Sequence, residues 1–174
     1  MRHHRRSILA AFLAVALSAL PATAGAKPVV AQFGDQTIRL FVPAHWEAVR
    51  GSDAGAALVF LSDAANNNTL QVNATPRERA ESAVTFLNAY LADLRRAAPV
   101  LGQTAVTGGE IGGRPAAFAR VTTSVTDRSE RGIEVELMIT VIETPDSLVT
   151  VQTATRTPLS RSQATSLLKI ARSV

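Results

Sequence analysis

The chain contains no cysteine among its 174 residues, and this absence excludes several kinds of protein. A disulfide scaffold, a thiol nucleophile and a lipid-modified N-terminal cysteine all require that residue. Aromatic side chains are also few, at 5% of the sequence, so we expect a core of valine, leucine, isoleucine and alanine. A chain of this length suits one domain that is held together by aliphatic packing.

The first 26 residues have the pattern of a secretory signal peptide. A basic start with Arg2, Arg5 and Arg6 precedes an uncharged apolar run at residues 7–20, and small residues at 22–26 offer a cleavage site. The apolar run is shorter than the roughly 20 residues that span a bilayer, so we expect cleavage rather than anchoring. This predicts a periplasmic or secreted protein whose residues 27–174 form a single domain, with no transmembrane segment after cleavage.

Removal of that segment also changes the charge balance. The three arginines account for part of the 18 Lys and Arg, so 15 remain against 14 Asp and Glu, and the mature net charge is +1. A nearly neutral domain lacks the basic surface that nucleic-acid binding requires. We therefore expect no nucleic-acid partner.

Alternation of apolar and polar residues identifies a strand hairpin late in the chain. Residues 133–141 alternate with a period of two, which is typical of a strand with one buried face. A turn at residues 143–147 and a second β-rich run at 148–153 complete an antiparallel hairpin, which we expect in the middle of a sheet. Residues 27–33 form either a loose leader or a short first strand. Further strands are predicted at residues 37–42, 57–61, 69–74, 103–107 and 116–126.

Two helices are predicted from capping patterns and apolar stripes. Thr75, Pro76 and Glu78 match a capping box with proline at the first helical position, which predicts one long helix at residues 77–97. Ser160 and Gln163 form a second capping box ahead of a C-terminal helix. Strand runs separated by only two helices predict an α+β fold around a mostly antiparallel sheet. The expected stripes are Ala83, Phe86, Leu87, Tyr90, Leu91 and Leu94, and Ala164, Leu167, Leu168 and Ala171.

The glycine-rich residues 108–115 invite comparison with a phosphate-binding loop. They have neither the Lys-Ser/Thr pair of a Walker motif nor GxGxxG spacing, and no helix pattern follows. Turns that flank a short strand around Ile111 explain the glycines more simply.

Short motifs spread over nearly all of the mature chain resemble the PsbP-like fold group. They are Pro43 with Trp46 soon after, the helix at residues 77–97, the turn Gly112-Gly113 before the later strands, and the ending at residues 170–174. That group includes the photosystem II extrinsic subunit P and bacterial envelope proteins of the DcrB and LpqN type. The resemblance implies an α/β/α sandwich around an antiparallel sheet. It also implies binding or accessory proteins rather than enzymes.

The residues offer little chemistry for catalysis. His45 is the only histidine of the mature chain, and a single histidine rarely suffices for acid–base work without an oriented partner. No G-x-S-x-G motif and no cluster of metal ligands is present, so we expect no catalytic residues, no metal and no cofactor. A weak hydrolase using His45 stays open as a second alternative.

A mixed polar and apolar strand face provides the leading hypothesis, an envelope binding or accessory module with a protein partner. Such a face suits an interface with an apolar centre and a polar rim, although a solvated sheet face has the same pattern. Arg120 is expected to face Glu134 or Glu136 across the strands. A carrier of a small apolar ligand is the first alternative, because Ala116, Ala117 and Ala119 leave room beside the sheet. The expected partner-binding residues are Trp46, Phe118, Arg120, Glu134, Glu136 and Met138.

Overall fold

The computed structural model describes residues 26–33, 36–44, 46–50, 58–61, 68–77, 81–126 and 132–156. The expected signal segment, His45 and the expected C-terminal helix lie outside the described residues. The elements within these ranges are β1 (Ala26–Phe33), β2 (Gln36–Pro43), β3 (Glu47–Arg50), β4 (Leu58–Leu61), β5 (Thr69–Pro76), α1 (Ala83–Ala97), β6 (Val100–Gln103), β7 (Thr107–Ile111), β8 (Arg114–Thr126), β9 (Gly132–Glu143) and β10 (Ser147–Arg156).

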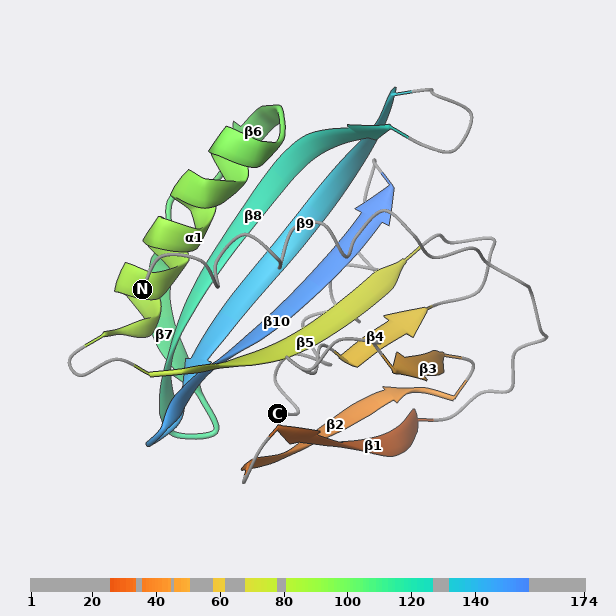
Figure 1. Ribbon diagram of the computed structural model, residues 1–174, viewed down its shortest axis with the longest axis vertical. Helices are drawn as coiled ribbons and strands as arrows, with labels where there is room; N and C mark the ends of the chain where they lie inside the picture. The colour runs from red at the N-terminus through yellow and green to blue at the C-terminus, as the bar shows by residue number, and fades with distance from the viewer. Residues whose placement is uncertain are drawn as a thin grey trace.

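The main sheet has the strand order β3-β4-β5-β10-β9-β8-β6, and β7 pairs with β8 beside β6. Its strand pairs are antiparallel throughout the described ranges. β1 and β2 form a separate antiparallel hairpin, so residues 27–33 belong to a strand rather than to a loose leader. Figure 1 shows α1 over the β7–β9 end of the sheet and the β1–β2 hairpin near the opposite end. The predicted α+β class with a mostly antiparallel sheet is confirmed.

The predicted central hairpin is also confirmed. β9 and β10 lie in the middle of the sheet with Glu143 opposite Leu148. Thr144 closes the turn between them, because its Oγ1 accepts a hydrogen bond of 3.0 Å from the Ser147 amide and its own amide donates to the Ser147 carbonyl at 2.9 Å. Buried side-chain bonds to the backbone fix a turn because they replace lost water contacts.

Two aliphatic clusters cover the two faces of the sheet. The α1 face holds the odd-numbered β8 and β9 residues against the helix, whereas the other face receives Leu40 and Val42 of the β1–β2 hairpin. The α/β/α sandwich is therefore shown only in part: in the described ranges one helix covers one face, and a hairpin packs on the other. The α1-side cluster contains Ala83, Phe86, Leu87, Leu91, Leu94, Ala117, Ala119, Val121, Val135, Leu137, Ile139, Val141, Leu148 and Ala154.

The predicted start of the long helix is wrong. Thr75 and Pro76 end β5, where they pair with Leu148 and Ser147 of β10. α1 instead begins after Ser82, whose Oγ accepts a 3.1 Å hydrogen bond from the Thr85 amide. The Thr-Pro pattern fits the end of a strand as well as a helix cap, and pairing with a central strand decides between them. The predicted C-terminal end at residue 97 is confirmed, and Arg95 and Arg96 lie in the last turn.

The glycine-rich segment forms a turn between strands, as predicted. Gly112 and Gly113 have φ of 57° and 75° and connect β7 to β8. Positive φ at both central residues belongs to the hairpin turns that favour glycine. The single strand expected at residues 103–107 is wrong, because Gln103 ends β6, Thr107 begins β7, and residues 104–106 join the two strands.

Candidate functional site

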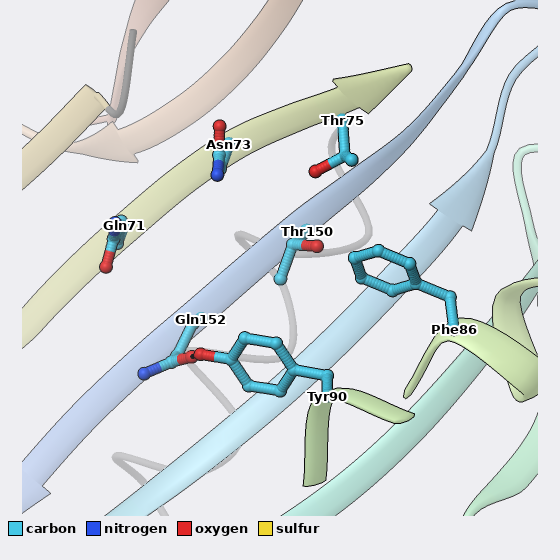
Figure 2. A pocket seen from close by; sticks show the side chains of 7 residues that line it. All are labelled: Gln71, Asn73, Thr75, Phe86, Tyr90, Thr150 and Gln152. Carbon is cyan, nitrogen blue, oxygen red and sulfur yellow. Dashed lines mark hydrogen bonds between the residues drawn. The ribbon is translucent and has the colours of Figure 1, made fainter. Parts of the chain in front are cut away.

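A cleft opens where the edge of α1 meets the sheet over β5 and β10. Figure 2 shows the seven side chains that line it, and the cleft has a volume of about 290 Å³ counted out to solvent. The space that a water-sized molecule can occupy inside it is about 10 Å³, which is room for one water. Its lining residues are Gln71, Asn73, Thr75, Phe86, Tyr90, Thr150 and Gln152.

The floor of the cleft is a block of neutral polar side chains on two neighbouring strands. Gln71 lies opposite Gln152 and Asn73 lies opposite Thr150 in the β5–β10 register. Alternate residues of a strand share one face, so these side chains, together with Thr75, point to the α1 side. The strand pairing thus places five side chains that end in an amide or a hydroxyl next to one another on one face of the sheet.

Phe86 and Tyr90 of α1 form the wall of the cleft. They are four residues apart, so they lie one above the other on the same side of the helix. The Tyr90 hydroxyl donates a hydrogen bond of 2.6 Å to the Gln152 side-chain oxygen. Burial raises the pKa of Tyr90 to about 12, because a phenolate loses hydration there. The hydroxyl therefore stays neutral and remains a donor at physiological pH.

Hydrogen bonds among the described residues satisfy the floor only in part. Gln71 and Thr150 are each 8% exposed, and among the described residues neither side chain has a hydrogen-bond partner. Their polar atoms are nevertheless not sealed from the cleft, in contrast to the Oγ1 atoms of Thr153 and Thr155 on the opposite face of β10. Buried polar groups normally have a partner, so this floor has spare capacity to bind one.

A polar clamp fixes α1, and hence the wall, relative to the β9–β10 turn. One oxygen of Glu143 accepts a 2.8 Å hydrogen bond from the amide of Ala83, the first helical residue. Its other oxygen accepts from Arg77 Nη2 at 2.6 Å. Arg77 Nε also donates to the Glu81 carbonyl at 2.9 Å. Charge-assisted bonds of this kind are about twice as strong as neutral ones, so the clamp sets where the helix starts.

The residues predicted for partner binding lie on the sheet face opposite α1. Arg120 pairs with Glu136 through two guanidinium nitrogens, with a Nε–Oε1 distance of 2.6 Å. Met138 is directly opposite Arg120 in the β8–β9 register, and the half-buried Phe118 shares this face. Glu134 precedes Glu136 by two residues on β9, so it lies on the same face, and it is exposed. The structure therefore brings five of the six predicted residues together.

Trp46 is the exception among these six. It is 3% exposed and packs in the cluster of Leu40 and Val72. A side chain so buried contributes to packing and cannot reach a partner without rearrangement, so the surface proposed below excludes it.

The cleft itself was not predicted from the sequence, although a signal for it exists. Polar residues recur at every second position in Gln71-Val72-Asn73-Ala74-Thr75 and again in Thr150-Val151-Gln152. Such a pattern also describes a solvated strand face, and only the register shows that the two polar sets are adjacent and next to a helix.

The described ranges contain no group of three or more His, Asp or Glu placed to hold a metal ion. Within the same ranges, no helix has the length and apolarity that a membrane crossing requires.

Solved structures of the PsbP-like fold group match this chain, and the resemblance expected from the sequence is confirmed at the level of the fold. Cyanobacterial PsbP (CyanoP) from Synechocystis matches with a TM-score of 0.58 and 15% identity over 78% of this chain and 84% of that chain. A Mog1 point mutant matches with a TM-score of 0.54 and 15% identity over 85% of this chain and 87% of that chain.

A third solved structure is LpqN of Mycobacterium tuberculosis, which is described as involved in cell envelope biogenesis. It matches with a TM-score of 0.50 and 16% identity over 86% of this chain and 87% of that chain. No protein-family model matches this sequence, and no curated protein sequence is similar enough to match it. Identities this low relate the chain to these proteins by fold.

Proposed function

We propose that this chain is an exported, non-enzymatic binding or accessory module of the bacterial cell envelope and that it binds a protein partner. The observation that carries the proposal is the Arg120–Glu136 ion pair set beside half-buried Phe118 and Met138 on one sheet face. Charged groups around an apolar centre are typical of protein interfaces. The envelope protein LpqN has the same fold, which supports the location.

Arg120 and Glu136 have the accessibility that such a surface needs. The Arg120 side chain is 51% exposed and that of Glu136 is 14% exposed, so a partner can contact the arginine while the carboxylate holds it in place. Long strands β8 and β9 carry both residues, so the geometry of the pair is preset before binding. A preset side chain loses less rotamer entropy on association.

Charge reversal tests this surface. With the mature chain as bait in an envelope extract of the source bacterium, Arg120→Glu and Glu136→Arg should each reduce capture of the partner at least about tenfold, since a lost close charge contact costs more than about 1.4 kcal/mol. The matched control is Arg114→Glu, at an exposed arginine that is the first residue of β8. Combining both reversals restores an ion pair, so recovery of capture would show that the partner requires the intact pair.

If both single-reversal variants capture the partner as well as Arg114→Glu does, the partner does not use this face. Circular dichroism and melting curves of each variant separate lost binding from lost folding. A partner captured equally by all variants would still leave a binding module, with its site elsewhere.

Export is tested by the mass of the protein isolated from its own cells. The basic start and apolar run of residues 2–20 predict a mature N-terminus near Gly25 or Lys27. An intact segment from Met1 to Ala26 in the isolated protein would contradict export with cleavage.

The two alternatives receive different support. The α1–sheet interface is filled by aliphatic side chains, with Ala117 and Ala119 packed under the helix, and the cleft at its margin has a mostly polar lining. This arrangement favours a polar ligand over the apolar ligand of the carrier hypothesis. The hydrolase alternative depends on His45, which lies outside the described residues, and replacing His45 by alanine would abolish any activity that depends on it.

A further inference from the structure

We propose that the cleft between α1 and the β5–β10 floor binds a neutral sugar residue, a ring that presents hydroxyl or acetamido groups to the floor and an apolar surface to the helix. This site lies on the α1 side of the sheet, whereas the proposed protein-binding surface lies on the other side. The two proposals therefore stand or fall separately.

The floor of the cleft is polar at a buried position where packing alone would favour apolar residues. Thr150 and Gln152 belong to β10, the central strand, whose residues are buried from Ser147 to Thr155. Leu148 and Ala154 on the same face of this strand belong to the aliphatic cluster. Gln152 accepts the bond from Tyr90, but Thr150 is buried without a side-chain partner among the described residues. Burial of an unpaired hydroxyl is unfavourable, so the change from apolar to polar within one strand face indicates a bound polar group.

The second argument is the spare hydrogen-bonding capacity of that floor. A side-chain amide offers two donors and one acceptor oxygen, and a hydroxyl offers both functions. Tyr90 uses the oxygen of Gln152, while Gln71, Asn73 and Thr150 have no side-chain hydrogen bond to any described residue. Mixed donors and acceptors are what a hydroxyl or acetamido group requires, because each of these groups both donates and accepts.

The third argument concerns charge. None of the seven lining residues is Asp, Glu, Lys, Arg or His, and the raised pKa keeps the Tyr90 hydroxyl neutral. An ionic ligand would enter a half-buried site without a counter-charge, which is strongly unfavourable. The chemistry therefore selects a neutral ligand over a phosphate, carboxylate or ammonium group.

The fourth argument is shape. Phe86 and Tyr90 present aromatic side chains on one side of the cleft only (Figure 2), and aromatic rings pack well against the apolar surface of a ring. The cleft of about 290 Å³ is mostly open to solvent, and the enclosed space within it is about 10 Å³. Since its inner part has room for one water, the sugar ring lies in the open part and reaches the floor through one substituent or through that water.

Titration of the mature chain with glucose, N-acetylglucosamine and glucuronate at neutral pH, followed by ¹⁵N chemical shifts, tests the proposal. We expect saturable shifts in β5, β10 and α1 with at least one of the two neutral sugars, and binding of glucuronate at least tenfold weaker than that of the neutral sugar that binds. Absence of saturable shifts with both neutral sugars overturns the proposal, and so does glucuronate binding as tight as that of the neutral sugars.

A pair of variants on one strand provides the matched control. Thr150→Val and Thr153→Val each remove one hydroxyl from β10 with little change of shape, but Thr150 lines the cleft and Thr153 lies on the opposite face. We expect Thr150→Val to weaken sugar binding at least fivefold and Thr153→Val to leave it unchanged. Equal effects of the two variants would overturn the site assignment. Tyr90→Phe, which retains the ring, is the second probe and should weaken binding as well.

Discussion

The α1 side of the sheet has two halves that differ sharply in chemistry. Over β8 and β9 the sheet residues are aliphatic and the helix stripe covers them, with Leu87 and Leu91 at 0% and 1% exposure. Over β5 and β10 the corresponding residues are amides and hydroxyls that line a cleft. Both halves share a sheet, a face and a helix, so the difference separates the packing that stabilises the fold from the polar surface of the proposed sugar site.

The boundary between the halves runs through β10. Leu148 and Ala154 lie in the aliphatic cluster, while Thr150 and Gln152 between them line the cleft. Aliphatic burial contributes about 25 cal/mol per Å² of apolar surface, whereas unpaired buried amides subtract from stability. We therefore expect substitutions in the aliphatic half to affect folding and substitutions in the polar half to affect binding.

The largest effect should follow from shortening Leu91. Its side chain is 1% exposed in the α1-side cluster, so Leu91→Ala should lower the free energy of unfolding by about 2–5 kcal/mol. Urea unfolding followed by the fluorescence of Trp46, the single tryptophan, measures this. Val84→Ala, at a 38% exposed position of the same helix, is the control. A change below about 1 kcal/mol for Leu91→Ala would refute the aliphatic half as the source of stability.

The next effect concerns the clamp that joins α1 to the β9–β10 turn. Glu143→Ala removes the acceptor for the Ala83 amide and leaves Arg77 without its carboxylate, which should cost about 1–3 kcal/mol. Glu143→Gln retains an acceptor oxygen and should cost less. Glu110→Ala, at an exposed glutamate of β7, provides the baseline. Equal stability of Glu143→Ala and Glu110→Ala would show that the helix is positioned by packing alone.

The two halves also differ in how far the sequence predicts them. The aliphatic half could be predicted because period-two alternation in residues 133–141 and the helical stripe of α1 each identify a buried face without knowledge of the other. The central hairpin and the Gly112-Gly113 turn depend on equally local chemistry. These elements are confirmed because their local patterns agree with the global fold.

The start of α1 and the cleft depend on long-range pairing. Thr75 and Pro76 satisfy a capping pattern locally, and only their pairing with β10 keeps them in a strand. The cleft needs the β5–β10 register, which joins residues some eighty positions apart in the sequence. The sequence predicts Trp46 as a partner-binding residue because its motif carries no information about which face it occupies, whereas the structure buries it.

A moderate effect should appear at high pH in the polar half. Burial raises the pKa of Tyr90 from 10.0 to about 12. The unfolded chain therefore loses this proton first as the pH rises, and the stability that the protonated form contributes is complete below pH 10 and lost between about pH 10 and 12. The loss is on the order of 2 kcal/mol.

The control for this pH effect is Tyr90→Phe, which should remove that part of the pH dependence and cost about 1 kcal/mol at neutral pH through the lost bond to Gln152. Because Tyr90 is the single tyrosine, ultraviolet absorbance reports its ionisation directly. Titration of the folded protein with the midpoint of an exposed phenol would contradict the buried position of the ring.

The smallest effect on folding, and the most informative for the comparison, is expected for Gln71→Leu. Gln71 is 8% exposed, its amide has no partner among the described residues, and it faces Gln152 across the β5–β10 register. Replacing an unpaired buried amide by an apolar group of similar size should be neutral or stabilising by up to about 1 kcal/mol, although the same change should abolish sugar binding in the titration described above. Urea unfolding and the sugar titration on one preparation separate the two effects. A loss of more than about 2 kcal/mol would mean that Gln71 is satisfied within the folded chain, and the polar floor would then be a structural network rather than a binding surface.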